Sequence, residues 1–140
     1  MVRGVLGFVV GAVLWMTAFF TLTSLVAFVW PAYAVHGRAW FETGVFTFEP
    51  PMAALNVVCW VLAEVLAGWV AVAIGRRREA AWALAVVLAV YLCVLHLYLY
   101  WPNFPWWYNV CVAGLAAPAV LLGGRLAGGF VLRREVVPAQ

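Results

Sequence analysis

The chain has 140 residues, of which 69% are hydrophobic and only 9% are charged. This composition is typical of a membrane protein and leaves no soluble segment large enough for a catalytic domain. Lysine and aspartate are absent, so the net charge of +3 comes from arginines. We interpret that charge as a sign of membrane topology and of contact with anionic lipid, not of nucleic-acid binding.

Four long apolar stretches follow one another along the chain, and each predicts a membrane-spanning helix. A helix needs about 20 residues to cross a hydrocarbon core of ~30 Å, and every stretch reaches that length. They are residues 5–30, 52–75, 80–100 and 106–126, and Glu64 is the one acidic residue among them. The sequence therefore predicts an all-α fold in a single domain, residues 1–140, built as an integral membrane bundle of four transmembrane helices.

The arginines are distributed unevenly across these four crossings. Only Arg38 falls on one side. The other side carries seven, namely Arg3, Arg76, Arg77, Arg78, Arg125, Arg133 and Arg134. Cytoplasmic segments of membrane proteins carry the excess of basic residues. We therefore expect cytoplasmic N- and C-termini.

One long and two short connections join the predicted helices. Residues 31–51 form a long external loop, which we expect to lie on the membrane surface or against a neighbouring protein. Short turns at 76–79 and 101–105 join antiparallel neighbours, so the last three helices should pack in sequence and the first should close the bundle. Residues 127–140 should leave the membrane as a flexible cytoplasmic tail.

Small residues recur at helical spacing in three of the four stretches. They allow helix backbones to approach closely, which matters in lipid because no hydrophobic effect drives helices together there. The candidates for such helix packing are Gly7, Gly11, Gly68, Gly75, Gly124 and Gly128. Their spacing leaves open whether they join helices of this chain or helices of a partner.

Glu64 is the most unusual residue of the predicted spans, because an ionised carboxylate is costly inside a bilayer. A rise of ~1.5 Å per residue places Glu64 about 18 Å from the cytoplasmic edge, with Tyr91 at the same depth and Thr17 slightly further out. We expect a hydrogen bond from Tyr91 or Thr17 to this acid. The alternative is that Glu64 carries protons or cations in a small oligomeric transporter or channel.

His96 and Asn109 both lie about 25 Å out from the same edge, on either side of the second short turn. We expect them to face each other across this hairpin. A neutral imidazole in a helix is also the usual ligand of haem iron or of a pigment's magnesium. A haem- or pigment-binding role of His96 is therefore an open alternative, although the spans contain no second histidine.

The remaining sequence offers no further chemistry. Cys59, Cys93 and Cys111 all fall inside predicted spans, where cysteine behaves as a small apolar residue. No phosphate-binding loop, nucleophile–base pair or metal-ligand motif is present in the sequence. We therefore predict no catalytic residue, no metal site and no cofactor, and we do not expect an enzyme.

Aromatic residues crowd both external connections. Tryptophan and tyrosine favour the headgroup level of a membrane, and aromatic residues with few charges are also typical of the centre of a protein interface. Because the long loop exceeds what a lipid anchor needs, we expect its aromatics and those of the second turn to face a partner. These partner-facing candidates are Trp40, Phe41, Phe46, Phe48, Trp101, Trp106, Trp107 and Tyr108.

The second half of the chain resembles a family of short four-helix bacterial membrane proteins of uncharacterised function. The resemblance rests on His96 followed by aromatics, on Phe104-Pro105-x-Trp107-Tyr108 entering a helix, and on Gly123-Gly124-Arg125 near that helix's end. It implies the four-helix topology and a bacterial inner (cytoplasmic) membrane. It implies no activity and no catalytic residue.

These observations favour a non-catalytic accessory or assembly subunit of a larger membrane complex, such as an energy-transducing one. Its expected partners are the lipid bilayer, bound lipid and other membrane-protein subunits, and not nucleic acid. The alternatives are the transporter or channel that uses Glu64 and the haem- or pigment-binding protein that uses His96.

Overall fold

The structure is a computed structural model that describes residues 2–134, with side chains described for residues 2–129. Every element within this part of the chain is a helix. The elements are α1 (Val2–Val29), α2 (Pro31–Thr43), α3 (Pro50–Gly75), α4 (Arg78–Cys93), the π-helix η1 (Val94–Leu99) and α5 (Trp106–Arg134). Four helices are long and apolar enough to cross a membrane: α1, α3, α4 with η1, and α5. The prediction of an all-helical chain with four candidate spans is confirmed.

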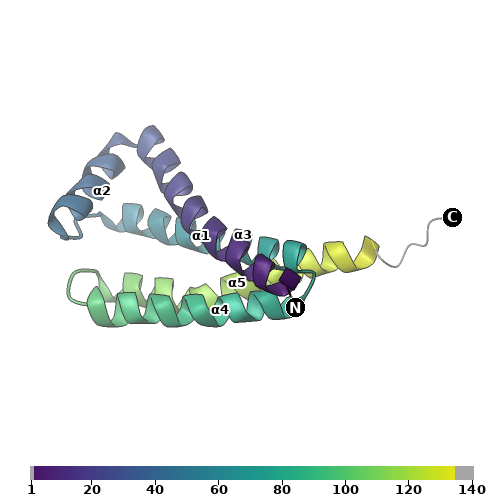
Figure 1. Cartoon of the computed structure of the whole chain (residues 1–140). Coiled ribbons are helices and arrows are strands. Elements are labelled where there is room, and N and C mark those ends of the chain that lie inside the picture. The colour runs from purple at the N-terminus through teal and green to yellow at the C-terminus, as the bar shows by residue number, and fades with distance from the viewer. Residues whose placement is uncertain (1, 135–140) are drawn as a thin grey trace.

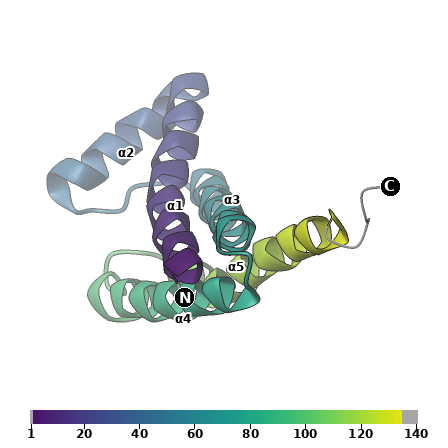
Figure 2. The ribbon, with the colours of Figure 1, turned by 45° about the vertical axis from the view of Figure 1, so that its right-hand side comes forward.

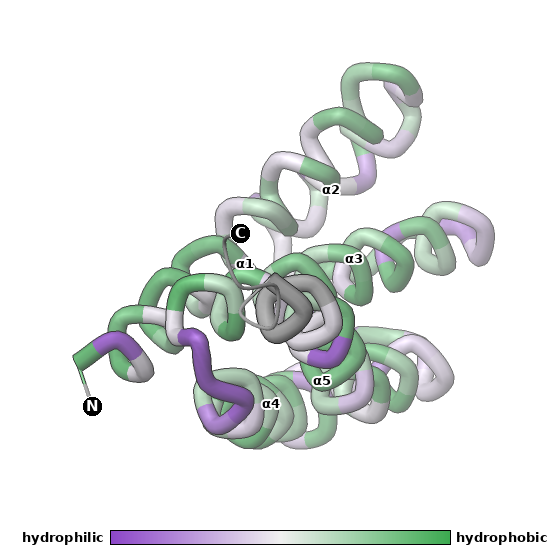
Figure 3. Tube along the Cα trace, turned by 90° about the vertical axis from the view of Figure 1, so that its right-hand side faces the viewer, coloured by the Kyte–Doolittle hydropathy of each residue, from purple (hydrophilic) through white to green (hydrophobic). Residues whose placement is uncertain are grey.

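The four candidate spans run back and forth between two ends of the molecule, each in the direction opposite to the span before it in the sequence (Figure 1). One end, called here the arginine end, holds the start of α1 and the turn Arg76–Glu79, which is the purple segment beside α4 in Figure 3. The other, the aromatic end, holds α2 and the turn at residues 100–105. From the arginine end, α1 crosses α3 and then diverges from α4, so that α1 and α2 form an inverted V above the other helices (Figures 1 and 2).

The central helix is α3, which packs mainly against α1 and α5 and only to a lesser extent against α4. The expectation that the last three spans pack in sequence is therefore wrong for α3, whose closest neighbour is α5. The reason lies in two glycines. A Cβ atom at Gly68 would overlap the carbonyl of Val120, and one at Gly123 would overlap the carbonyl of Val65. At each contact a glycine of one helix lies directly against the backbone of the other helix, because the glycine carries no side chain.

The other glycines expected at helix interfaces also pack within the chain. Gly7 and Gly11 lie against α3, where a Cβ at Gly7 would come 2.7 Å from the nitrogen of Gly75. A Cβ at Gly124 would lie 2.8 Å from the Cβ of Ala81 on α4. Gly128 meets only the flexible side chain of Arg78. The sequence reading missed Gly123, although it makes one of the closest approaches.

The long connection between the first two spans contains a helix, which the expectation of a surface loop did not include. Pro31 starts α2 at a position where a helix needs no backbone donor. Gly44 ends it in the left-handed conformation, with φ 68° and its N–H donating to the carbonyl of Trp40. Because glycine adopts this conformation without steric cost, the chain turns back there toward the bundle.

The last span is longer than the sequence indicated. Helix α5 continues past residue 126 to Arg134, so residues 127–134 are helical and not the start of a loose tail. The two glycines at 128–129 do not end it, because a glycine inside a helix costs only about 1 kcal/mol relative to alanine. The rest of the expected tail, residues 135–140, lies outside the described residues.

Candidate functional site

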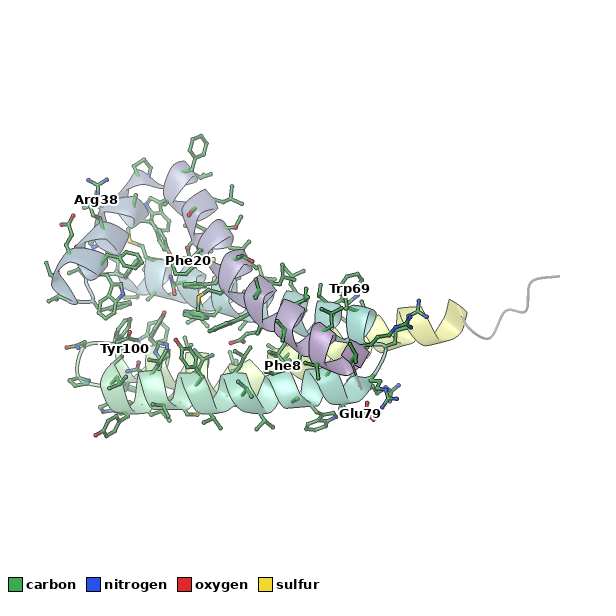
Figure 4. All side chains as sticks on the ribbon, in the orientation of Figure 1. Phe8, Phe20, Arg38, Trp69, Glu79 and Tyr100 are labelled. Atoms are coloured by element: carbon green, nitrogen blue, oxygen red, sulfur yellow. The ribbon has the colours of Figure 1, made fainter. Side chains whose placement is uncertain are left out.

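A cavity of about 430 Å³ lies between α1, α2 and the aromatic-end halves of α3, α4 and α5. It exists because α1 diverges from α4 toward the aromatic end while α2 folds back over the gap (Figure 1). More than half of the residues that line it are aromatic. Figure 4 shows Phe20 on α1 and Tyr100 after η1 on opposite sides of this region.

One polar network forms part of the cavity wall and connects α2, α3 and α5. The indole N–H of Trp60 donates to the Tyr108 hydroxyl at 3.2 Å, and that hydroxyl donates to Asn56 Oδ1 at 2.6 Å. Asn56 Nδ2 in turn donates to the hydroxyl of Tyr33 at 2.5 Å. The hydrogen bonds all run in one direction, so each polarises the next, and the series ends at the O–H of Tyr33.

The O–H of Tyr33 is a donor with no acceptor among the described residues. Tyr33 lies in α2, is buried and lines the cavity. Burial raises the pKa of this phenol to about 12, although the hydrogen bond from Asn56 lowers it. Tyr33 therefore keeps its proton at neutral pH and offers a hydrogen-bond donor at the cavity wall.

A second polar pair joins η1 to α5. His96 Nδ1 lies 3.1 Å from Asn109 Oδ1, as the hairpin register predicts, and both side chains are buried. His96 lies in the π-helical turn η1, in which hydrogen bonds close over five residues, as from the Tyr100 N–H to the carbonyl of Leu95.

Asn109 also fixes the protonation pattern of His96. Its Nδ2 donates to the carbonyl of Phe104 at 3.4 Å, which turns its Oδ1 toward the imidazole. A neutral imidazole must then carry its hydrogen on Nδ1 and keep a lone pair on Nε2. His96 lines the cavity, and its Nε2 has no hydrogen-bond partner among the described residues. The cavity wall thus offers an acceptor as well as a donor.

The same lone pair would suit a haem iron or a pigment's magnesium. However, the rings of Trp60, Tyr100, Phe104 and Tyr108 surround His96, with centroids 5.7 to 6.2 Å away. Such close packing favours a small head group at Nε2 over a macrocycle.

The cavity is accessible from the side of the bundle. Met16 and Phe20 of α1 and Tyr91 of α4 line it and are 37%, 47% and 44% exposed. These residues lie within candidate spans, so this opening faces the membrane core if the helices cross a bilayer. Arg38 and Phe41 of α2 line the cavity nearer the aromatic end.

Glu64 is fully buried, but the expected hydrogen bond is absent. Neither carboxyl oxygen has a hydrogen-bond partner among the described residues. Thr17 instead donates to carbonyls of its own helix, and its side chain is exposed. Tyr91 packs edge-on against Trp15 with centroids 5.8 Å apart. Depth along the helix axes was therefore insufficient to predict the partner of Glu64, because the rotation of each helix about its axis decides which side chains meet. Glu64 does not line the cavity.

The aromatic residues expected to face a partner divide into two groups. Trp40 and Phe46 pack against Phe104, with centroids 4.6 and 4.4 Å away, and Phe48 packs against Tyr33. Tyr108 is only 3% exposed, so for this residue the expectation is wrong: it binds the loop to the helices inside the chain. Phe41, Trp101 and Trp106 are exposed and Trp107 is half-buried, and for these residues a partner-facing role stays a prediction.

Sequence reasoning did not single out Tyr33, Asn56, Trp15 or Trp60. Asn56 was the available signal, because an amide inside an apolar span needs a partner. Trp15 is another residue of interest: it lines the cavity, and its buried indole N–H has no partner among the described residues. The three cysteines are free, with Cys59 buried and the other two partly exposed.

Comparisons with known proteins give no family for this chain. No protein-family model matches it, and no curated protein or solved structure matches it either. The resemblance of its second half to short four-helix bacterial membrane proteins therefore stays a prediction.

Proposed function

We propose that this chain is a non-catalytic multi-pass membrane protein that binds a lipid-soluble small molecule in its lateral cavity. The observation that carries this proposal is the position of the opening. Met16, Phe20 and Tyr91 lie at the cavity edge and within candidate spans. A ligand could therefore enter from the lipid, and apolar walls with a few convergent polar groups are typical of small-molecule sites.

The test is to fill the cavity without disturbing the bundle. Gly37 lines the cavity from α2, and a Cβ there would meet only one ring atom of Phe48, at 4.0 Å. Gly37→Trp should therefore occupy ligand space. Gly114→Trp is the matched control, because a Cβ at Gly114 meets nothing within 4 Å and this residue does not line the cavity.

The measurement is mass spectrometry of the apolar compounds extracted from protein that is purified in mild detergent from its native membrane. We expect a compound that co-purifies with the wild type and with Gly114→Trp and that is lost from Gly37→Trp. Retention of the same compounds by Gly37→Trp, or the absence of any specific compound from the wild type, would refute the proposal.

An accessory or assembly role in a larger membrane complex is the second candidate. It is supported by three of the predicted partner-facing aromatics, which stay exposed at the aromatic end: Phe41 is 76%, Trp101 45% and Trp106 68% exposed. Exposed aromatics are frequent hot spots of protein interfaces. The two roles are compatible, since a subunit can hold a lipid-soluble ligand for its complex.

We further propose a bacterial inner membrane, with the arginine end in the cytoplasm. The support is the count of seven arginines against one in the sequence. Reporter enzymes fused after Gln140 test the orientation. A phosphatase that requires export should be inactive there and a cytoplasmic fluorescent reporter active, whereas the opposite pair of results would reverse the topology.

A further inference from the structure

We infer that the cavity recognises a phenolic hydroxyl, carried on a flat ring with an apolar tail. This inference rests on the proposed function and specifies the chemistry of the ligand head. It follows from three features of the cavity wall: an acceptor at His96 Nε2, a donor at the Tyr33 hydroxyl, and aromatic rings around both.

The acceptor requires a ligand that donates. Asn109 holds the hydrogen of the imidazole on Nδ1 at 3.1 Å, and Nε2 is left with a lone pair facing the cavity. An acceptor that a ligand covers without forming a hydrogen bond loses its solvation, which is costly. A ligand with only ether or carbonyl oxygens, or with only a hydrocarbon chain, would cover Nε2 without satisfying it. A hydroxyl hydrogen would satisfy it.

The donor favours a ligand whose polar head also accepts. Tyr33 accepts from Asn56 and keeps its own hydrogen available, and a hydroxyl oxygen can accept that hydrogen while donating its own. Tyr108 places both groups in one region. Its hydroxyl bonds to the same Asn56 that holds Tyr33, at 2.6 Å, and its ring centroid lies 5.7 Å from that of His96.

The walls favour a flat ring over an alkyl chain next to this hydroxyl. Phe104 and Tyr108 stack at 5.1 Å, and Phe19 stacks on Trp60 at 3.8 Å. Aromatic pairs gain energy beyond the area they bury, so a phenol ring fits these surfaces better than a saturated chain. The tail of the ligand would leave between α1 and α4, past the exposed edges of Phe20 and Tyr91.

The experiment compares three probes on the full chain in nanodiscs of dimyristoyl phosphatidylcholine. They are 4-decylphenol, 4-decylanisole, which has the ring but cannot donate, and 1-dodecanol, which has the hydroxyl but no ring. Calorimetric titration gives the Kd of each probe, which is expressed as a concentration of the probe in the lipid phase. We expect the phenol to bind at least about tenfold more tightly than either other probe, which corresponds to about 1.4 kcal/mol.

Variants assign this preference to the two polar groups. His96→Phe should reduce the phenol-to-anisole preference to about one, whereas His36→Phe, the control outside the cavity, should leave it unchanged. His36 instead shares a hydrogen bond with Thr47. Tyr33→Phe keeps the ring and should weaken both oxygen-bearing ring probes about equally, because both accept from Tyr33 but only the phenol donates.

The wild-type comparison alone can overturn the inference, so it does not depend on any variant folding. Equal binding of the three probes, all of it lost in Gly37→Trp, would refute recognition of a phenolic hydroxyl and leave the cavity proposal standing. Absence of binding by all three would also refute it, and the cavity proposal would then be judged by the extracted compounds. A preference that survives His96→Phe would refute the assignment of the acceptor to His96.

Discussion

The backbone of Gly68 lies directly against the carbonyl of Val120, and this contact joins α3 to α5. Both helices run from the aromatic end to the arginine end, so they are parallel although α4 separates them in the chain (Figure 1). Gly123 makes the reciprocal approach to Val65. The centre of the bundle is thus a contact between backbones, which cannot move aside as a flexible side chain can.

Gly68→Ala should therefore destabilise the bundle. The added methyl group would overlap the Val120 carbonyl, and overpacking of this kind typically costs about 1–3 kcal/mol. Gly114→Ala is the control, because it has open space and should be neutral or slightly stabilising. Thermal unfolding in one detergent, followed by loss of the monodisperse chromatographic peak, compares the two. Equal midpoints for Gly68→Ala and the wild type would contradict the close contact.

The stability of the protein should depend on pH through Tyr33. Its pKa is about 12 in the folded chain and about 10 when exposed, so the folded state holds the proton more tightly. The part of the free energy of unfolding that depends on the protonated Tyr33 is fully present below pH 10 and is lost as the pH rises through 12. Tyr33→Phe cannot ionise. The wild type should therefore lose stability relative to Tyr33→Phe between pH 10 and 12. Between pH 6 and 9 the difference in stability between the two proteins should stay constant.

Replacement of Glu64 by an apolar residue should be tolerated. A buried carboxyl group without a partner loses its interactions with water and gains none, at a cost of about 1–3 kcal/mol. Glu64→Leu should then raise the unfolding midpoint, and Glu64→Gln should leave it close to the wild-type value. A strongly destabilised Glu64→Leu would mean that Glu64 has a partner in the folded protein that supports it.

The transporter alternative makes a different prediction for the same residue. If Glu64 carries protons, wild-type protein in proteoliposomes should move protons or cations and Glu64→Gln should not, with both proteins equally folded. Glu64 lies outside the cavity wall, so we expect no flux from either protein. Flux that depends on Glu64 would restore the transporter alternative.

Two triple variants should separate docking from internal packing at the aromatic end. Truncation to alanine of the exposed set, Phe41, Trp101 and Trp106, should release a partner complex and leave the isolated chain stable. Truncation of the packed set, Trp40, Phe46 and Phe48, should instead lower the unfolding midpoint, because it removes contacts with Phe104, Tyr108 and Tyr33. Co-purification in full yield after truncation of the exposed set would mean that these rings anchor the protein in lipid.

The sequence was sufficient for the features that depend on position along one helix axis or across one short turn. Hydropathy located the four candidate spans, because an apolar run of about 20 residues is the length that a helix needs to cross a bilayer. The pairing of His96 with Asn109 followed from the short turn at 101–105, which sets the register of the two helices it joins. Small-residue spacing correctly marked Gly68 as a packing position.

The sequence was insufficient wherever a feature depends on how distant segments rotate and fold back. Glu64, Tyr91 and Thr17 share a depth, yet Thr17 turns toward the outside of the bundle. The network of Tyr33, Asn56 and Tyr108 needs three separate segments to meet, which happens only because Gly44 reverses the chain after α2. No local pattern contains that information.

The contact between α3 and α5 also constrains how the protein is made. Helix α3 leaves the ribosome well before α5, since chains emerge from the N-terminus at about 5–20 residues per second. Glu64 lies one turn from Gly68 and therefore on the same side of α3 as the contact with α5. We expect the nascent chain to carry this acid incompletely covered until most of α5 has been synthesised. We expect this carboxyl group to need polar surroundings during biogenesis more than in the finished bundle. The insertion machinery or water at the bilayer surface would supply them.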